Sequence, residues 1–476
     1  MAFEVDVPSK DLSRFRAVLP PERFEELERE CEEARRLLDG HVVWNLNSTA
    51  RGGGVVELIR PLVAYARGAG IDARWMVIEG APDFFTVTKR IHNRLHGWVG
   101  DGGPLDENAR RIYESVLAEN LGQLIDRVRP NDVVILHDPQ TAGLVHDLHV
   151  AGALVIWRCH VGLDRPNDLA REAWAFLRPY LLEADAYVFS RKAFAWEGLD
   201  RKKIVIIAPT IDVFSPKNCD LDPATVRGIL LVSGLVAGAE VPAPPAFPCQ
   251  DGTPRRVECR ARMFEDEPLH VRDPVVVQVS RWDALKDPIG VIEGFARHVT
   301  AETGAHLVYA APAVEAVSDD PDGELVMREA LAAREALPAG ARRRIHLAAL
   351  PMDDLDENAI VVNALQRHAR VIVQKSLAEG FGLTVAEAMW KARPVVASRI
   401  GGIQEQITDG ETGILLDDPH DLEAYGAAVT ALLMDRVRAE AMGRRARTRV
   451  RDRFTSVRSL LDYLALIRRF LLVPSP

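Results

Sequence analysis

The stretch "RVIVQKSLAEGFGLTVAEAMWKARPVVAS", residues 370–398, reads as a strand, a glycine-rich turn, a helix and a second strand. Two short, nearly continuous apolar runs joined by a helix are typical of parallel strands buried on both faces of a sheet. The same stretch carries Glu379 in the turn and Glu387 in the helix, eight positions later (387 − 379). It therefore predicts an α/β fold and raises the question of what the two carboxylates bind.

The alternation of apolar strands with amphipathic helices extends to both sides of this stretch. A charged helix is expected at residues 22–38 and an amphipathic one at 456–472. Strand-like runs recur at residues 41–46, 73–78, 132–138, 153–160, 186–190 and 203–209, and again at 273–280, 305–310, 344–350, 393–398 and 413–416. This pattern indicates two parallel sheets, each covered by helices on both faces.

The alternation stops after Ile211 and resumes near residue 272, which divides the chain. The stretch between includes "VPAPPAFPCQDGTPRR", residues 241–256, whose composition is typical of an irregular segment. We expect a Rossmann-like domain at 1–215, a Pro-rich insertion or connection at 216–271, a second Rossmann-like domain at 272–450 and a helix at 451–476 that packs back on the first domain. Because open parallel sheets bind ligands at the carboxyl ends of their strands, two doubly wound domains would face a central crevice lined by the loops that follow strands.

Composition and charge exclude several classes of protein. The chain has 476 residues, a net charge of −10 and a pI near 5.8, which argues against a general nucleic-acid binder because phosphate binding needs a basic face. Its five cysteines are scattered and form no Cys-x-x-Cys motif, which indicates a reducing compartment and no structural metal. The sequence begins without a signal-peptide pattern, and no apolar run reaches the length of a membrane span. We therefore expect a cytoplasmic protein.

Glycines follow the first strand of the first half. In "NSTARGGGVVELI", residues 47–59, Gly52, Gly53 and Gly54 lie between a strand and the start of a helix. Bare backbone amides at a helix N-terminus suit an anionic phosphate. The stretch is neither Gly-x-Gly-x-x-Gly nor a Walker loop, so a tight turn that needs positive φ is an equal alternative.

Two cations follow the first strand of the second half. In "QVSRWDALKDPIG", residues 278–290, Asp287 and Pro288 read as a helix cap and first helical residue. Lys286 then lies just outside the positive end of a helix and forms, with Arg281, a candidate clamp for a diphosphate. Taken alone, the loop is more simply explained by two ordinary surface cations.

Two further polar residues follow strands of the first half. Asp138 ends the run "VVILHD", and His160 ends "VIWRCH". Because Asp138 precedes Pro139, it is equally well explained as a helix N-cap. A lone histidine is more often structural than catalytic, but its place after a strand keeps His160 as a candidate.

The opening stretch now has a chemical interpretation. Glu379 follows a strand, and the next backbone amides form a helix N-terminus that can receive a phosphate or a sugar hydroxyl. These amides belong to Phe381, Gly382, Leu383 and Thr384. Glu387 falls near the first helical turn, where it either accepts hydrogen bonds from ribose hydroxyls or favours the helix dipole by about 0.3–1 kcal/mol. The dipole explains neither Glu379 nor the glycines, so the pair indicates a sugar-nucleotide site.

Several blocks together resemble a known family. The Glu-seven-residues-Glu spacing and "SRWDALKD" resemble the paired glutamates and the Arg/Lys clamp of retaining GT-B glycosyltransferases of family 4. The blocks "NSTARGGGVVELI", "ARWMVIEG", "FFTVTKRIHN", "LHDPQ", "WRCH", "EGFGLTVAEAMWKARPVV" and "GGIQEQITDGETG" are similar, within that group, to trehalose glycosyltransferring synthases. The similarity covers about residues 40–212 and 272–470. The stretch 218–270 does not fit the shorter members, and "VYAAPAVEA" lacks a glycine that is usual after that strand.

The resemblance implies a role for each matching residue of the second half. Glu379 would bind hydroxyls of the donor glucose, and Glu387 would bind the ribose. Arg281 and Lys286 would hold the diphosphate.

The resemblance also implies roles in the first half, as the acceptor domain. Gly53 and Gly54 would approach the phosphates. His160 would contact the donor glucose near its 6-hydroxyl, and Asp138 would orient the acceptor.

The reaction implied by the resemblance is reversible transfer of glucose from a nucleoside diphosphate glucose (ADP, UDP or GDP) to free glucose, giving α,α-trehalose. Retention without a positioned covalent nucleophile suggests front-face substitution, in which the departing phosphate oxygen takes the acceptor's proton while cations stabilise the developing charge. On this account no cofactor or bound metal is required, although magnesium is expected to stimulate. The expected partners are small sugars and a nucleotide sugar, with no nucleic acid and no membrane, and the candidate assembly is a homodimer.

Other functions stay open. The same machinery could use another sugar or a sugar phosphate as acceptor, although the sequence reveals no additional basic pocket for an acceptor phosphate. A phosphorylase would usually need a pyridoxal-phosphate lysine or a phosphate site. A binding-only protein or an epimerase-like enzyme could share the scaffold. Loss of the clamp or of the paired glutamates would favour a binding-only protein, but all of these residues are present.

Overall fold

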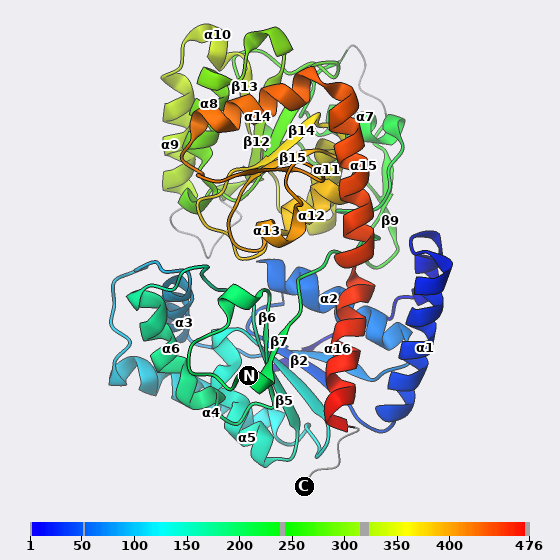
Figure 1. Ribbon diagram of the computed structural model, residues 1–476, viewed down its shortest axis with the longest axis vertical. Coiled ribbons are helices and arrows are strands. Elements are labelled where there is room, and N and C mark those ends of the chain that lie inside the picture. Colours follow the sequence, from blue (N-terminus) through cyan, green and yellow to red (C-terminus); the bar gives the residue numbers. More distant parts are fainter. Residues whose placement is uncertain (1, 51–52, 239–242, 315–322, 472–476) are drawn as a thin grey trace. The chain divides into compact units, whose positions relative to one another are not determined.

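The computed structural model divides into two compact units, one formed by Met1–Thr210 with Phe454–Pro476 and the other by Ile211–Arg453 (Figure 1). It describes residues 2–50, 53–238, 243–314 and 323–471. We call the two parts the first unit and the second unit. The final helix, α16 (Ser456–Leu471), thus belongs with the first unit although it follows the second in sequence.

The described strands of the first unit form one seven-stranded sheet in the order β1-β3-β2-β4-β5-β6-β7. These strands are β1 (Phe3–Val5), β2 (Val43–Asn47), β3 (Ala73–Val77), β4 (Val133–His137), β5 (Leu154–Cys159), β6 (Ala186–Phe189) and β7 (Ile204–Ile206). Neighbours pair in parallel except for the edge strand β1, which runs antiparallel to β3. The strand runs predicted for this half are confirmed, whereas β1 was not predicted.

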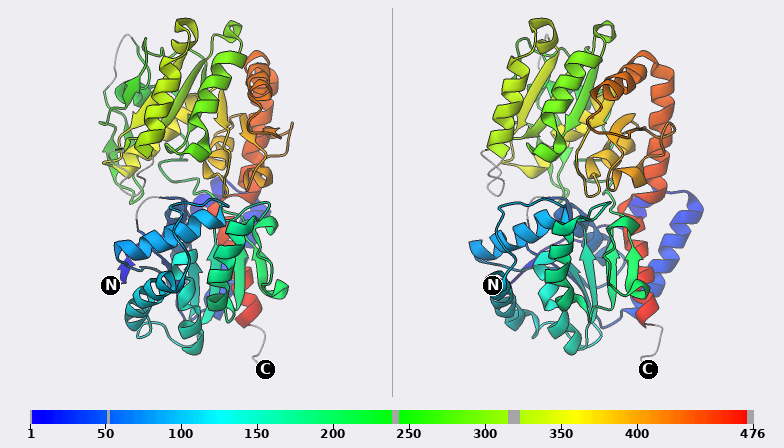
Figure 2. Two further views of the ribbon diagram at one scale, coloured as in Figure 1. Left: turned by 90° about the vertical axis from the view of Figure 1, so that its left-hand side faces the viewer. Right: turned by 60° about the vertical axis from the view of Figure 1, so that its left-hand side comes forward.

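Helices cover both faces of the first sheet (Figures 1 and 2). On one face α16 packs against α1 (Pro21–Leu37) and α2 (Gly53–Gly68). The other face carries α3 (Pro82–Leu95), α4 (Glu107–Leu124), the 3₁₀ helix η2 (Pro139–Leu144), α5 (Val145–Val150) and α6 (Asp168–Leu181). Short 3₁₀ helices also occur at Leu12–Ala17, Lys192–Phe194 and Arg201–Lys203.

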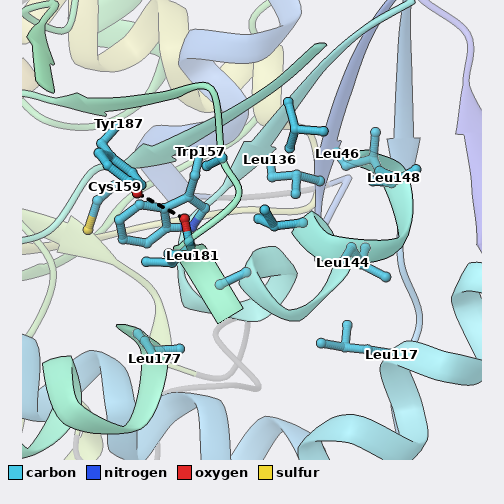
Figure 3. Close-up of a cluster of buried hydrophobic side chains, with 14 of the residues drawn as sticks. Leu46, Leu117, Leu136, Leu144, Leu148, Trp157, Cys159, Leu177, Leu181 and Tyr187 are labelled. Atoms are coloured by element: carbon cyan, nitrogen blue, oxygen red, sulfur yellow. Dashed lines mark hydrogen bonds between the residues drawn. The ribbon is translucent and has the colours of Figure 1, made fainter. Parts of the chain in front are cut away.

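Large apolar side chains fill the space between this sheet and the α3–α6 layer. Trp157 of β5, Leu136 of β4 and Leu46 of β2 belong to one cluster with Leu177 of α6 and Leu148 of α5 (Figure 3). The Tyr187 hydroxyl donates a hydrogen bond of 3.0 Å to the Leu181 carbonyl, so the buried phenol keeps a polar partner. Alternate residues of each strand enter this core while their neighbours face the other helix layer, as the continuous apolar runs predicted.

The described strands of the second unit form another seven-stranded sheet, in the order β10-β13-β12-β11-β14-β15-β16. They are β10 (Arg262–Phe264), β11 (Val275–Val279), β12 (His306–Pro312), β13 (Ile345–Leu350), β14 (Val371–Gln374), β15 (Val395–Ser398) and β16 (Ile414–Leu416). Only β10 is antiparallel among them. The parallel strands follow the 3-2-1-4-5-6 order of a doubly wound dinucleotide-binding sheet.

Helices also lie on both faces of the second sheet (Figures 1 and 2). One layer contains α8 (Pro288–His298), α9 (Gly323–Glu335) and α14 (Leu422–Met434), which enclose a core with Phe295 and Tyr309. The other contains α11 (Leu355–His368) and α12 (Leu383–Trp390), with α15 (Arg436–Arg453) packed on α12. Shorter helical turns are η5 (Ala284–Lys286), η6 (Ala301–Thr303), α10 (Ala339–Arg342) and α13 (Ile403–Gln406).

The segment 216–271 is more ordered than its composition predicted. It contains α7 (Pro223–Val232), the hairpin strands β8 (Ala246–Pro248) and β9 (Pro254–Arg256), and edge strand β10. Asp222 caps α7 through the amides of Ala224 and Thr225, and α7 packs on α11. The prediction of an irregular insertion was wrong for these parts. The run "VRGILLV" belongs to an amphipathic helix that the Pro-rich composition of the segment obscured. Within the described residues, no helix is long and apolar enough to cross a membrane.

Candidate active site

Each sheet has one place where its strand order reverses, and the predicted site residues follow the strands on both sides of it. In the second unit the reversal lies between β11 and β14, and in the first unit between β2 and β4. Loops that leave parallel strands at such a point diverge to opposite faces and leave room for a ligand at the carboxyl ends. Lys286 and Glu379 follow β11 and β14, whereas Gly53 and Asp138 follow β2 and β4.

Lys286 and Glu379 form an ion pair in the second unit. The Lys286 Nζ lies 2.8 Å from Glu379 Oε2, and their side chains keep only 16% and 13% of their surface exposed. The Ser376 hydroxyl also contacts Oε2, at 3.4 Å. No described residue donates to Glu379 Oε1, so one oxygen of this carboxylate is left for a hydroxyl group.

Buried polar residues hold the two loops together. Gln278 in β11 donates to the Lys286 carbonyl at 2.8 Å and accepts from the Lys375 amide at 3.2 Å. The Lys375 ammonium is fully buried and pairs with Asp287, whose other oxygen caps α8 through the Gly290 amide. The predicted cap is therefore confirmed, although Asp287 has a left-handed φ of 51°. These contacts fix the position of Lys286 before any ligand binds.

Arg281 is more accessible than Lys286. Its side chain is 54% exposed, and its Nη2 lies 3.1 Å from Asp283 Oδ2. A guanidinium that is more than half exposed can turn toward a phosphate without leaving a buried charge behind.

The glycine-rich turn before α12 is closely packed. Gly382 has a φ of +80°, and the Gly402 amide donates to the Gly380 carbonyl at 2.8 Å. A Cβ on Gly401 would lie 1.8 Å from the Glu379 carbonyl oxygen, so this loop approaches Glu379 only because residue 401 is glycine. The amides of Leu383 and Thr384 start α12, and the Thr384 hydroxyl donates to Gln374.

Glu387 lies deeper than expected. It is in the second turn of α12, rather than near the first, and its side chain is 1% exposed. Glu387 Oε1 pairs with Lys217 Nζ at 3.1 Å, while Oε2 is buried without a hydrogen-bond partner. An unsatisfied buried carboxylate oxygen costs free energy, which the hydroxyl of a bound ligand would recover. The dipole alternative does not explain this burial.

Lys391 follows one turn after Glu387 and is also buried. Its ammonium donates to Asn218 Oδ1 at 3.0 Å and to the Glu387 carbonyl at 3.2 Å. Burial lowers the pKa of Lys391 to about 7, and the Glu387 carboxylate partly opposes the fall. Residues 217 and 218 therefore anchor the start of the 216–271 segment against α12.

Asp138 has an unusual backbone in the first unit. Its φ of 63° and ψ of −179° lie in a region that is essentially confined to glycine and that costs about 1–3 kcal/mol. Its carboxylate makes no cap hydrogen bond to η2, and Oδ1 instead accepts from the His160 amide at 2.8 Å. The N-cap interpretation is therefore wrong for this side chain. The other oxygen accepts from no described residue.

A chain of hydrogen bonds runs beside Asp138 through two histidines. His137 Nε2 lies 3.1 Å from Asn45 Oδ1, and His137 Nδ1 lies 3.0 Å from His160 Nε2. Because a carbonyl oxygen only accepts, His137 carries its proton on Nε2 and accepts from His160 Nε2. Arg158 Nε approaches the remaining His160 nitrogen at 3.5 Å. Both ring nitrogens of His160 are thus engaged within the first unit.

Burial changes the charge of this cluster. It raises the pKa of Asp138 to about 7, against the His160 amide and the Arg158 cation, which both lower it. Burial and the Arg158 cation lower the pKa of His137 to about 3, and the pKa of His160 falls well below its ordinary value for the same reasons. Both histidines are therefore neutral near pH 7, while Asp138 is close to half ionised.

The glycines after β2 start a helix, as expected. Gly53 has a φ of +80° and is the first residue of α2, and Gly54 follows it on the surface. A Cβ on Gly53 would meet no atom within 4 Å, so its backbone conformation rather than crowding favours glycine.

Sequence reasoning missed the residues that position the predicted ones. Gln278, Lys375, Asn45 and Lys217 were not identified. The first three were visible as polar residues within or just after apolar strands, in "VVVQVS", "VIVQKS" and "VVWNLN". Among the described residues, no group of three or more His, Cys, Asp or Glu side chains could hold a metal ion.

Both units match models of known families. Residues 45–196 match the N-terminal domain of trehalose synthase, and residues 358–449 match glycosyl transferases group 1. An Anabaena protein solved with UDP and glucose has a similar fold (TM-score 0.60, 14% identity, 90% of this chain and 100% of that chain covered). So does an α,α-trehalose-phosphate synthase from Burkholderia vietnamiensis (TM-score 0.64, 15% identity, 90% and 98% covered). Two Rossmann-like units with these neighbours define a GT-B glycosyltransferase.

Nearly full-length relatives identify the family. The trehalose synthase of Pyrococcus horikoshii is 33% identical over 467 residues, which cover 96% of each chain. That of Rubrobacter xylanophilus is 35% identical over 475 residues, covering 99% of this chain and 100% of its own. A trehalose phosphorylase from Pleurotus pulmonarius is more distant, at 25% identity over 88% of this chain and 56% of its own. The chain belongs to the trehalose synthase family, as the sequence motifs predicted.

Proposed function

We propose that this glycosyltransferase moves glucose from a nucleoside diphosphate glucose to free glucose, reversibly and with retention, to give α,α-trehalose. The observation that carries the proposal is the Lys286–Glu379 pair at the strand reversal of the second unit, with Nζ and Oε2 2.8 Å apart. It sets a cation for a phosphate directly beside a carboxylate with a free oxygen for glucose hydroxyls. A sugar diphosphate carries both groups across one bond.

The donor is assigned to the second unit. Arg281 and Lys286 would neutralise the diphosphate, and the amides at the start of α12 would add hydrogen bonds to it. The ribose would satisfy the unpartnered Oε2 of Glu387.

The acceptor is assigned to the first unit. Asp138 offers one carboxylate oxygen to sugar hydroxyls and lies beside two neutral histidines. An uncharged sugar suits this cluster better than a sugar phosphate, which an ionised Asp138 would repel.

Front-face substitution fits this assignment. The bond from glucose C1 to the phosphate oxygen breaks, the bond from C1 to the acceptor oxygen forms on the same face, and the acceptor proton passes to the departing phosphate oxygen. Arg281 and Lys286 would stabilise the negative charge that develops on the leaving nucleoside diphosphate.

A donor panel tests the proposal. The protein is incubated with glucose and ADP-, UDP- or GDP-glucose, with magnesium and with a chelator, and the disaccharide is identified by NMR. We expect α,α-trehalose with at least one donor, activity without added metal, and much slower use of glucose 6-phosphate. A clear preference for glucose 6-phosphate, or no trehalose with any donor, would refute the proposal.

The second candidate is phosphorolysis of trehalose, which the phosphorylase relatives favour. The same assay separates it, because trehalose with inorganic phosphate would then yield glucose 1-phosphate in the absence of any nucleotide.

A further inference from the structure

A pocket of about 330 Å³ lies in the first unit at the amino ends of β2, β3 and β4. Its lining includes Val42, Asp72 and Arg129, which precede these three parallel strands. Asp138 follows the carboxyl end of β4, so the pocket is at the opposite edge of the sheet from the proposed acceptor site. Its volume falls in the range of about 300–1,000 Å³ that small-molecule sites occupy.

The lining of the pocket is positively charged. Its charged side chains are four arginines and two aspartates, namely Arg35, Arg74, Arg127, Arg129, Asp39 and Asp72. The formal balance of these side chains is +2 (4 − 2), within a chain whose net charge is −10, and Glu32 outside the lining pairs with Arg35 at 2.6 Å. His41 adds a titratable ring, and Leu38 and Trp44 add apolar surface. A local cationic excess of this kind concentrates anions.

A buried carboxylate fixes the loops that form the pocket. Asp132 accepts hydrogen bonds from the Val42 amide at 2.8 Å, the Trp44 indole at 3.1 Å and the Arg129 amide at 3.0 Å. It therefore ties the residues before β2 to those before β4. All these donors are satisfied within the protein, so the pocket is preformed and a ligand would not have to order it.

Two of the arginines are also held in place. Asp72 binds the Arg74 guanidinium through two hydrogen bonds of 2.9 and 2.8 Å, and that guanidinium lies 5.2 Å from the centre of the Trp44 ring. Gly70, with a φ of +80°, leaves room for the Arg35 stem, because a Cβ there would lie 2.9 Å from Arg35 Cδ.

The other two arginines, Arg127 and Arg129, keep charge available. Arg127 forms a long ion pair with Glu4, at 3.6 Å, and half of its side-chain surface is exposed. Among the described residues, no carboxylate pairs with the Arg129 guanidinium and no side chain bonds to the His41 ring. An anion would supply the hydrogen-bond acceptors that these groups lack.

We propose that this pocket binds a phosphate ester that carries hydroxyl groups, such as a sugar phosphate or a nucleotide. Arg129 and Arg127 recognise the phosphate, and Asp39 and Asp72 accept hydrogen bonds from hydroxyls. The site is separate from the substrates, and β4 connects it directly to Asp138. The assignment does not rest on the proposed function of the enzyme.

Calorimetry on the full chain tests the site with three probes, which are inorganic phosphate, glucose 6-phosphate and AMP. We expect one of the two esters to bind at least tenfold more tightly than phosphate, which also identifies the ester. Arg129→Ala and Arg127→Ala should each weaken that ester by about 10- to 100-fold. Arg16→Ala, which removes an exposed arginine paired with Glu28, should leave binding unchanged.

Lys286→Ala separates this pocket from the active site. Binding that persists in Lys286→Ala and is lost in Arg129→Ala supports the proposal. Binding that is lost in Lys286→Ala and kept in Arg129→Ala, or esters that bind no better than phosphate, would overturn it. Thermal unfolding without ligand checks that each variant is folded, and the exposed Arg129 side chain makes no hydrogen bond or ion pair with a described residue.

Discussion

The two sheets end in polar clusters of opposite kinds. The cluster of the second unit contains two ion pairs. Lys286 lies 2.8 Å from Glu379, and Lys217 lies 3.1 Å from Glu387. In the first unit, Asp138 accepts a hydrogen bond from the His160 backbone amide and lies beside histidines that are neutral near pH 7. Paired ions suit a ligand that brings its own charge, because each pair can exchange one partner for a charged ligand group. A hydrogen-bonded cluster suits a neutral ligand, which has no charge to exchange.

The two clusters also differ in backbone strain. Gly382 adopts its positive φ freely, whereas Asp138 adopts a conformation that costs about 1–3 kcal/mol. The surrounding contacts compensate, since the Asp138 amide donates to the Arg158 carbonyl at 2.7 Å and the Trp157 indole donates to the Asp138 carbonyl at 3.1 Å. Asp138 thus combines a strained backbone with a carboxylate oxygen to which no described residue donates, as the acceptor role that we propose for it requires.

The largest effect is expected at the ion pair. Lys286→Ala should lower kcat by about 10²–10³-fold, because it removes charge from the leaving diphosphate. Arg281→Ala should lower kcat in the same direction. Steady-state kinetics with each donor measures both, circular dichroism checks the fold, and the exposed Lys89→Ala is the matched control. Near-normal turnover in both clamp variants would exclude the diphosphate clamp.

Asp138→Asn tests the first unit. Loss of a charged hydrogen bond of about 1.5–3 kcal/mol should reduce acceptor kcat/KM by roughly 10- to 150-fold while donor affinity, measured by calorimetry, changes little. A silent variant would show that the carboxylate does not orient the acceptor.

The pH dependence sharpens the same test. The pKa of Asp138 is raised to about 7, and only the ionised form offers charged hydrogen bonds through both oxygens. Acceptor kcat/KM should therefore rise as the pH increases from 6 to 8, and this limb should vanish in Asp138→Asn. An unchanged pH profile in the variant would assign the limb to another group.

A smaller effect is expected at Glu387. Glu387→Gln replaces a charged acceptor by a neutral one, a difference of about 1 kcal/mol, so the KM of the donor should rise by roughly 5- to 10-fold with less change in kcat. Glu440→Gln, on the exposed face of α15, is the control. Equal donor KM values in the two variants would remove Glu387 from the donor site.

The smallest effect is expected at the hairpin of segment 216–271. Arg255 pairs with Asp354 at the surface, so Arg255→Ala should leave kcat unchanged and shift Tm by no more than about 2–4 °C. A tenfold loss of kcat would show that the hairpin takes part in the chemistry.

Much of the fold was predictable because apolar runs and glycine stops are local signals. Parallel strands such as β4 and β14 are recognisable from continuous apolar runs, and α1 is recognisable from its periodic, charged sequence. The edge strands β1 and β10 were missed because each has only three residues. A strand that is so short and pairs with only one neighbour needs little apolar sequence. Helix α7 was missed because flanking prolines dominated the composition of its segment.

The sequence by itself determined the strand-and-loop order that places Arg281, Lys286, Glu379 and Asp138 after strands, because hydrophobic periodicity and turn residues act over a few positions. Only the tertiary structure decided their partners. Lys286 and Glu379 are 93 residues apart, and Lys217 reaches Glu387 across 170 (387 − 217). Such pairs depend on strand order and loop packing, which no local spacing encodes. The charge of Asp138 was decided in the same way, since burial and the neighbouring Arg158 and His160, rather than residue type, set its pKa.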